Sequence, residues 1–367
     1  MDVREAFFDG RAASEIRLWH ALDADLLVPF HYFGIDDGVD LHDVAWGGPQ
    51  GYNQDALAKV YLGDAGRQRA ERIIEAVRDK VTDVSKMRAL GFCASVTHAE
   101  FMTDFFNDSG IPSLCVTGST PSQLRRESIE RLRNGEVNCI FAVDVFNEGL
   151  DIPQVDTVLM LRPTQSPTIF LQQLGRGLRR DKDKSVLTVL DFIGFHRKEF
   201  RFDKILRAVT GATRSKLIQD IQHDFPFLPA GCQILLEEIV KERVLENVRS
   251  QLRFPKKDLI NDVRSYLPQF PDITLIDYLT LSGRELGDVY KVATWTEVRV
   301  ALNLAPAPTS QNSEILRGSM KMLLHVDDVE RAVIYRRLAQ DHSLTVGTMT
   351  STEVAFAEMF TTLLWKH

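Results

Sequence analysis

Short apolar runs alternate with amphipathic segments between about residues 82 and 210 of this chain. Apolar runs of this length predict buried strands, and apolar positions spaced three and four apart predict helices. Strands that are apolar on both faces and separated by helices are typical of a parallel sheet covered on both sides. The sequence therefore predicts an α/β domain with strands at 87–95, 113–118, 137–145, 155–161 and 185–194, and helices at 97–110, 121–135 and 166–180.

The segments on either side of this domain have other patterns. Within 1–81, a helix at 12–24 and a strand at 26–35 lead into a Gly- and Asp-rich stretch at 36–54, which we interpret as a connecting loop, and a helix follows at 64–81. We expect 1–81 to be a connecting segment. Beyond residue 210 short helical patterns are interrupted by proline-rich stretches, which predicts a mostly α-helical domain over 211–367.

Composition and charge limit the class of protein. Hydrophobic residues make up 44% and charged residues 26% of the 367 residues, so the chain is expected to fold. The net charge of −7 argues against a small basic protein that coats nucleic acid. The four cysteines form no C-x-x-C pair, which predicts reduced thiols, and neither a signal peptide nor a membrane span is evident. We expect a cytoplasmic protein without a membrane partner.

Residues 172–179 form the most informative stretch, a Q-x-x-G-R-x-x-R arrangement. On a helix, the four defining residues lie three or four positions apart and share one face: Gln172, Gly175, Arg176 and Arg179. Guanidinium groups stay charged and bind phosphate oxygens in a bidentate fork, and glycine lets another surface approach closely. This face suits a triphosphate. A solvated basic helix face is the alternative.

The loop that follows the predicted strand at 137–145 reads Val-Asp-Val-Phe-Asn-Glu-Gly-Leu-Asp-Ile-Pro over 143–153. Loops at this edge of parallel α/β sheets commonly hold ligands. Together with the Q-x-x-G-R-x-x-R helix, it resembles motifs V and VI of the C-terminal RecA-like domain of superfamily 2 helicases. The stretch from Asn147 to Arg180 is more closely similar to bacterial DEAD/DEAH helicases related to restriction-enzyme motor subunits, and 211–367 resembles a helical domain of unknown function that follows the core in one such group.

The resemblance implies roles for residues around ATP. Gly149 and Asp151 would approach the nucleotide together with Gln172 and Gly175. Arg176 and Arg179 would be the arginine fingers that stabilise charge on the departing γ-phosphate.

The same resemblance implies a nucleic-acid track. Ser95, Thr97 and His98 lie in a stretch like motif IV, where a strand ends in hydroxyls at a helix N-terminus that favours phosphate. His98 could equally be an ordinary helix-start residue. Thr117 and Gly118 end the next strand and are expected to contact phosphate in the same way.

Two residues in the motif V stretch complete the candidates for this track. Asp144 and Asn147 are expected to contact nucleic acid, and bracing of the loop is the alternative. The family resemblance favours DNA over RNA.

One expected motif is missing from these residues. Superfamily 2 motors bind ATP and Mg²⁺ with a G-x-x-x-x-G-K-[ST] loop and an acidic box on a first motor domain, and neither occurs in the sequence. We therefore expect the chain to be the C-terminal portion of an ATP-dependent DNA helicase or translocase, inactive alone and completed by an N-terminal helicase domain in cis or in trans. The alternatives are a non-catalytic nucleic-acid or protein binding module and an unrelated α/β enzyme.

Overall fold

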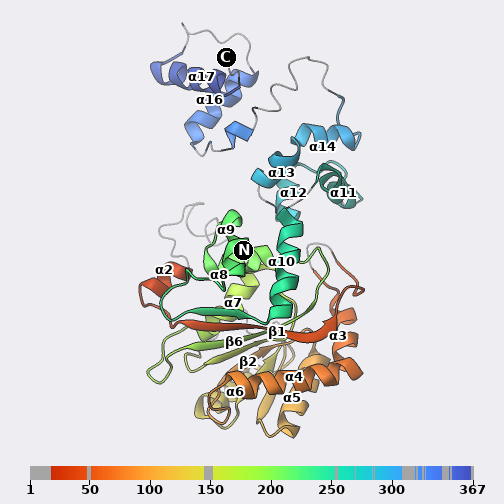
Figure 1. Ribbon diagram of the computed structural model, residues 1–367, viewed down its shortest axis with the longest axis vertical. Helices are drawn as coiled ribbons and strands as arrows, with labels where there is room; N and C mark the ends of the chain where they lie inside the picture. Colours follow the sequence, from red (N-terminus) through yellow and green to blue (C-terminus); the bar gives the residue numbers. More distant parts are fainter. Residues whose placement is uncertain are drawn as a thin grey trace. The chain divides into compact units, whose positions relative to one another are not determined.

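A computed structural model describes most of the chain as two compact units, Met1–Leu252 and Arg253–His367. Figure 1 shows the elements of both units in sequence colours. The described residues are 18–47, 51–143, 152–252, 255–268, 270–282, 284, 286–307, 319, 321–324, 326, 328–340, 347 and 349–364.

A seven-stranded parallel sheet forms the centre of the first unit, with the order β3-β4-β2-β5-β6-β1-β7. Four-residue strands such as β2 and β5 are buried on both faces, which explains their continuous apolar sequence. The predicted parallel α/β fold is confirmed. The strands are β1 Phe30–Asp40, β2 Ala89–Phe92, β3 Ser113–Val116, β4 Cys139–Ala142, β5 Thr157–Met160, β6 Leu187–Phe195 and β7 Gln233–Leu236.

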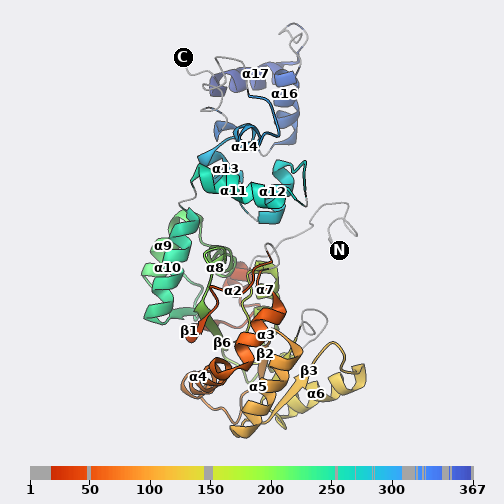
Figure 2. The same ribbon diagram turned by 90° about the vertical axis from the view of Figure 1, so that its right-hand side faces the viewer.

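Helices cover both faces of this sheet, as Figures 1 and 2 show. Their apolar sides and the sheet create two cores. On one face, α4 buries Ile73 and Val77 and α5 buries Met102 and Phe106. On the other, α7, α8 and α10 pack against the sheet. The helices of the first unit are α2 Leu18–Asp23, α3 Gln54–Leu62, α4 Asp64–Lys80, α5 Val96–Asp108, α6 Ser122–Asn134, α7 Pro167–Gly177, α8 Phe202–Thr210, α9 Arg214–Gln222 and α10 Glu238–Leu252.

The first unit extends further in both directions than the boundaries predicted at 81/82 and 210/211. In place of the loop predicted over 36–54, β1 continues to Asp40 and lies between β6 and β7. Beyond residue 210, β7 adds a strand at the edge, and α10 buries Val240, Val244 and Val248 in the same core. These segments pack onto the sheet because each has an apolar face that is buried there.

The second unit is helical over its described residues, as predicted. Its apolar core is centred on Tyr278, Val289 and Val298, with Trp295 stacked on Tyr278 at 5.6 Å between ring centroids. The elements are α11 Lys256–Tyr266, α12 Leu275–Ser282, α13 Leu286–Val292, α14 Trp295–Ala301, η2 Lys321–Leu323, α16 Val329–Gln340 and α17 Ser351–Leu364.

All four cysteines are free thiols, and Cys93 and Cys139 are buried. Among the described residues, the helices are all too short or too polar to cross a lipid bilayer.

Candidate functional site

The loop after β2 places two hydroxyl side chains at the start of α5. Ser95 is the N-cap of this helix, and its Oγ accepts a hydrogen bond from the His98 amide at 3.1 Å. The Ser95 Oγ also lies 3.0 Å from the Thr97 Oγ1, and Thr97 is exposed. Thr97 is therefore available to a ligand at this helix end, whereas Ser95 already caps the helix.

His98 points the other way, into the protein. Its side chain is fully buried, Nδ1 accepts a hydrogen bond from the Ala94 amide at 3.2 Å, and Nε2 lies 3.4 Å from Arg69 Nη1. Burial, together with the nearby Arg69 charge, lowers the pKa of His98 well below its usual value, so the ring is neutral. With no exposed ring nitrogen, His98 cannot contact nucleic acid in this conformation. The interpretation as a helix-start residue fits the geometry better.

The loop after β3 forms a second group of hydroxyls at the same edge. The Thr117 amide donates to the Thr120 Oγ1 at 2.9 Å, and the Thr117 Oγ1 lies 2.9 Å from the Ser119 Oγ. Thr117 is largely buried, while Gly118 is exposed, and a Cβ added to Gly118 would meet no atom within 4 Å. The exposed backbone at Gly118 is thus the more accessible part of this loop.

Strand order places these two loops on either side of the end of β4. Because β4 lies between β2 and β3, with Ala142 in register with both Phe92 and Val116, all three strands end at one level. The motif V candidates lie outside the described residues: Asp144, Asn147, Gly149 and Asp151. The chain is described again from Ile152, which is buried.

The predicted arginine helix is present but shorter than expected. α7 begins after Ser166, whose Oγ accepts from the Ile169 amide at 3.4 Å, and Pro167 occupies its first turn. Gln172 and Arg176 lie four residues apart on this helix and are partly buried. The helix ends at Gly177, so Arg179 lies beyond it and the prediction of one helical face for all four motif residues is wrong.

Gly175 and Gly177 differ in what surrounds them. A Cβ at Gly175 would meet no atom within 4 Å, whereas a Cβ at Gly177 would lie 2.2 Å from the Leu187 Cδ1. Close packing of α7 on β6 thus explains Gly177 but not Gly175. Since glycine inside a helix is less stable than alanine, the chain retains at Gly175 a residue that its own packing does not require.

This contrast predicts opposite effects of two neighbouring substitutions. Gly175→Ala is expected to raise the free energy of unfolding of this chain by about 0.5–1 kcal/mol, because alanine favours the helix. Gly177→Ala is expected to lower it by about 1–3 kcal/mol, because the new methyl group overlaps Leu187. Urea unfolding followed by circular dichroism measures both. A destabilised Gly175→Ala variant would show that another part of the chain needs this glycine.

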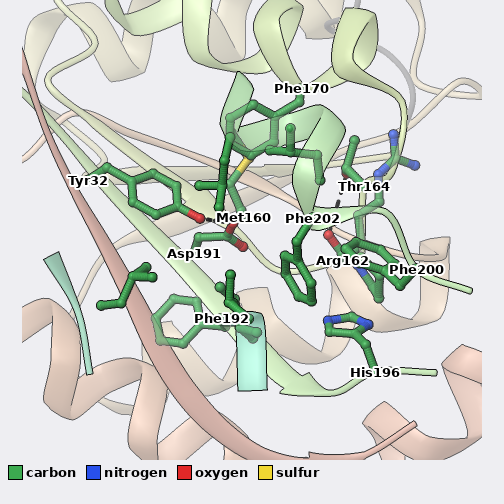
Figure 3. A pocket seen from close by; sticks show the side chains of 16 residues that line it. Tyr32, Met160, Arg162, Thr164, Phe170, Asp191, Phe192, His196, Phe200 and Phe202 are labelled. Atoms are coloured by element: carbon green, nitrogen blue, oxygen red, sulfur yellow. Dashed lines mark hydrogen bonds between the residues drawn. The ribbon is translucent and has the colours of Figure 1, made fainter. Parts of the chain in front are cut away.

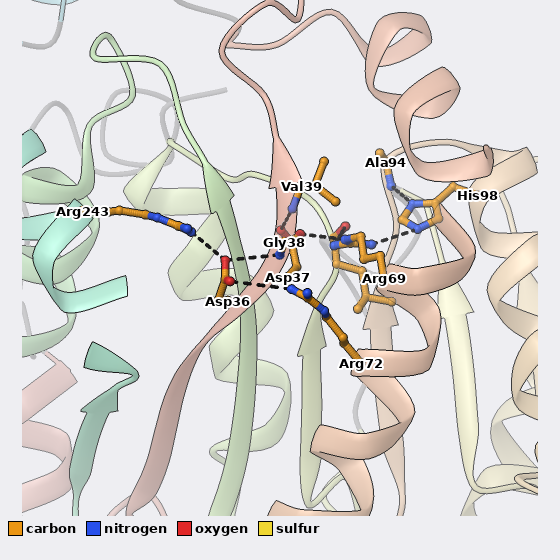
Figure 4. A network of polar contacts seen from close by, with 10 residues as sticks. Asp36, Asp37, Gly38, Val39, Arg69, Arg72, Ala94, His98 and Arg243 are labelled. Carbon is orange, nitrogen blue, oxygen red and sulfur yellow. Dashed lines mark hydrogen bonds and ion pairs between the residues drawn. The ribbon is translucent and has the colours of Figure 1, made fainter. Parts of the chain in front are cut away.

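A buried ion pair ties the β1 segment to the motif IV loop, as Figure 4 shows. The Arg69 Nε donates to the Asp37 Oδ2 at 2.7 Å, and Nη2 donates to the Leu161 carbonyl at 2.9 Å. The exposed fractions of Arg69 and Asp37 are 1% and 2%. Arg69 thereby contacts three parts of the chain. These are β1, the residue that follows β5 and, through His98, the first turn of α5.

Asp37 and Arg69 are not among the site residues predicted from the sequence. Arg69 lies four residues before Ile73 and eight before Val77, on the apolar stripe of α4. A charged residue on such a stripe requires a buried partner, which was the available signal.

A narrow cavity lies beneath α7, between this helix, α8 and the sheet (Figure 3). The Tyr32 hydroxyl donates a hydrogen bond to the Asp191 carboxyl group inside it. Burial raises the pKa of Asp191 to about 7. The aromatic residues that line this cavity include Phe170, Phe200 and Phe202.

The pKa of Asp191 predicts a pH dependence of stability. A carboxyl group with a raised pKa in the folded state stabilises the fold at low pH, and this contribution is lost as pH rises through about 7. Asp191→Asn cannot ionise and can still accept from Tyr32. Its stability relative to the wild type is therefore expected to increase by about 1–3 kcal/mol between pH 5 and 8. Urea unfolding over this range tests the prediction, and a constant difference would contradict it.

Comparison with known proteins identifies the central segment. Residues 69–181 match the model of the helicase conserved C-terminal domain, a range that begins at Arg69 and includes β2 to α7. Residues 69–181 of the first unit are therefore similar to a helicase conserved C-terminal domain.

Individual relatives are similar over part of their length. IRC3 of Saccharomyces cerevisiae, which bears the name of an ATP-dependent helicase, is 33% identical over 124 residues, 34% of this chain and 18% of its own. A 51.5 kDa protein of a Lactococcus phage is 26% identical over 46% of this chain and 36% of its own. UvrABC system protein B of Leptospira biflexa is 24% identical over 48% and 26%. The chain thus matches well under half the length of these relatives.

Solved structures give weaker likenesses. The DNA-bound Type ISP restriction-modification enzyme LlaBIII has a TM-score of 0.43 and 12% identity, over 98% of this chain and 25% of that one. The RNA-bound domain 2 of the DEAD-box helicase Mss116p has a TM-score of 0.32 and 16% identity, over 75% and 87%. Scores this low carry no argument about function.

Proposed function

We propose that this chain supplies the second motor domain of an ATP-dependent DNA helicase or translocase. The observation that carries this proposal is the face of α7 on which Gln172, Gly175 and Arg176 lie within a helicase C-terminal domain. The open space over Gly175 permits close approach by a surface outside the described residues. Arg176 and Arg179 would stabilise charge on the γ-phosphate.

The residues present suit one part of an ATP site. Guanidinium groups fit phosphate oxygens, which supports a contact to ATP from this side. Within the described ranges, no group of three or more His, Cys, Asp or Glu residues could hold a metal ion. In the proposed enzyme, a first motor domain, in cis or in trans, would supply the phosphate-binding loop and hold Mg²⁺.

The proposed track for DNA runs along the carboxyl ends of three adjacent strands, β2, β4 and β3. The Thr97 hydroxyl and the backbone at Gly118 are its exposed described parts, with Ser95 and Thr117 shaping the two loops. Hydroxyls and amides of this kind contact phosphates without reading bases. We propose that Asp144 and Asn147, which follow β4 in the sequence, also contribute to this track.

The test combines this chain with a superfamily 2 first motor domain and measures ATP hydrolysis with and without DNA. We expect stimulation that neither part gives alone, and RNA in place of DNA tests the choice of track. A combination that hydrolyses ATP no faster than the first domain alone, with either nucleic acid, would refute the proposal.

A non-catalytic binding module is the second candidate, favoured by the missing ATP-binding loop in these 367 residues. It predicts that the chain alone binds nucleic acid in a salt-sensitive manner and that ATP does not alter this affinity. Fluorescence anisotropy at several salt concentrations, with and without ATP, distinguishes the two candidates.

A further inference from the structure

Lys184 forms a three-way contact with backbone carbonyl groups. Its Nζ donates to the carbonyl oxygens of Pro153 at 2.6 Å, Val155 at 2.9 Å and Gly177 at 3.0 Å. An ammonium group has three hydrogen-bond donors, so these three acceptors use all of them. Burial lowers the pKa of Lys184 to about 8, which leaves the group charged at neutral pH.

The three carbonyls come from the two segments that carry the ATP-site motifs. Pro153 is the last residue of the motif V stretch, Val155 lies two residues further on, and Gly177 is the last residue of α7. The last carbonyls of a helix lack partners within the helix and carry partial negative charge, which a cation near the C-terminus satisfies. Lys184 therefore caps the arginine helix and joins it to the segment after motif V.

A second contact holds the turn that carries this lysine. The Gln154 Nε2 donates to the Asp181 Oδ2 at 3.2 Å, and the Lys184 amide donates to the Asp181 carbonyl at 3.2 Å. The turn over 181–184 is thus attached to the same segment through an independent pair. Lys182, in the middle of this turn, is exposed and provides a matched control.

We propose that Lys184 is a positioning residue, which fixes the C-terminal end of α7 to residues 153–155 and thereby sets where Arg176 lies relative to this segment. This inference rests on the proposed function as far as Arg176 acts on ATP. The fixation itself concerns the chain alone. Lysine suits this place better than arginine, because a planar guanidinium cannot aim at three converging carbonyls as a tetrahedral ammonium does.

The first experiment tests the fixation in the chain as it stands. Hydrogen–deuterium exchange is measured for the amides of Val155 and Leu178, which are hydrogen-bonded to the Ile152 and Gly175 carbonyls. Lys184→Met is expected to raise exchange at both sites by about tenfold or more, because three charge-assisted hydrogen bonds are lost. Lys184→Arg should give a smaller increase. Lys182→Met should leave the rates unchanged. Equal rates in Lys184→Met and Lys182→Met would overturn the proposal.

The second experiment tests positioning in the enzyme assembled with a first motor domain. Lys184→Met is expected to lower kcat by roughly 10- to 100-fold with little change in KM for ATP, since small misplacements of a catalytic group have effects of this size. In the Arg176→Ala background the same substitution should have almost no further effect, because Lys184 acts through Arg176. Raised exchange with unchanged kcat, or additive effects in the double variant, would overturn the positioning role.

The two experiments separate the inference from the function on which it rests. An assembly of wild-type chain and first motor domain without nucleic-acid-stimulated hydrolysis would refute the proposed function. The exchange rates would still decide whether Lys184 joins α7 to residues 153–155.

Discussion

Replacing Arg176 with alanine is expected to lower ATP turnover by about 10³-fold or more in the enzyme assembled with a first motor domain. The guanidinium would contact charge that develops only as the γ-phosphate departs, so the loss should fall on kcat and leave KM for ATP nearly unchanged. Arg176→Lys should recover little of the activity, because an ammonium keeps the charge and loses the bidentate fork. Steady-state hydrolysis at saturating DNA measures these effects.

Arg180 provides the matched control for this prediction. It follows Arg179 directly in the sequence, but its guanidinium Nη1 pairs with the Asp25 Oδ2 at 2.7 Å in an exposed ion pair. Arg180→Ala should therefore change turnover less than twofold, since exposed ion pairs contribute little. Arg179→Ala tests the second proposed finger. Unchanged turnover in both Arg176→Ala and Arg179→Ala would contradict the assignment of arginine fingers.

Sequence reasoning succeeded where local pattern alone determines the element. The buried strands β2, β4 and β5 are continuous apolar runs, and Ser166 with Pro167 marks the start of α7 in the way that helix starts generally are marked. Sequence reasoning was less successful where tertiary packing determines where an element ends. The early end of α7 accompanies the contact between Gly177 and Leu187, two residues that no local pattern connects.

The candidate site shows the same division. The Q-x-x-G-R-x-x-R pattern locates the arginines, because their spacing and chemistry are local properties. The buried His98 ring contacts the Ala94 amide and Arg69, and Arg69 lies on a different helix, α4. Local sequence pattern does not reveal such a contact. Lys184 was missed for a related reason: its partners are backbone carbonyls, which leave no trace in the side-chain sequence.

Replacing Arg69 with methionine is expected to lower the free energy of unfolding of the first unit by about 3–5 kcal/mol, which follows from leaving the Asp37 carboxylate buried without its partner. The Leu161 carbonyl would lose a donor at the same time. Urea unfolding at pH 7 measures the loss, with Arg72→Met as the control. Arg72 lies on the same helix, but it is half-exposed and its Nη1 is 3.6 Å from the Asp36 Oδ2, so its loss should change stability by less than about 1 kcal/mol.

Combining Arg69→Met with Asp37→Leu separates the charge from the packing. Removing both charges takes away the uncompensated carboxylate, so the double variant should recover a large part of the stability that Arg69→Met loses. Asp37→Leu also removes the hydrogen bond that the Val39 amide donates to Asp37, which limits the recovery. A double variant as unstable as Arg69→Met would contradict a cost due to the buried charge. The contacts of Arg69 with the Leu161 carbonyl and with His98 would then account for most of the stability that Arg69→Met loses.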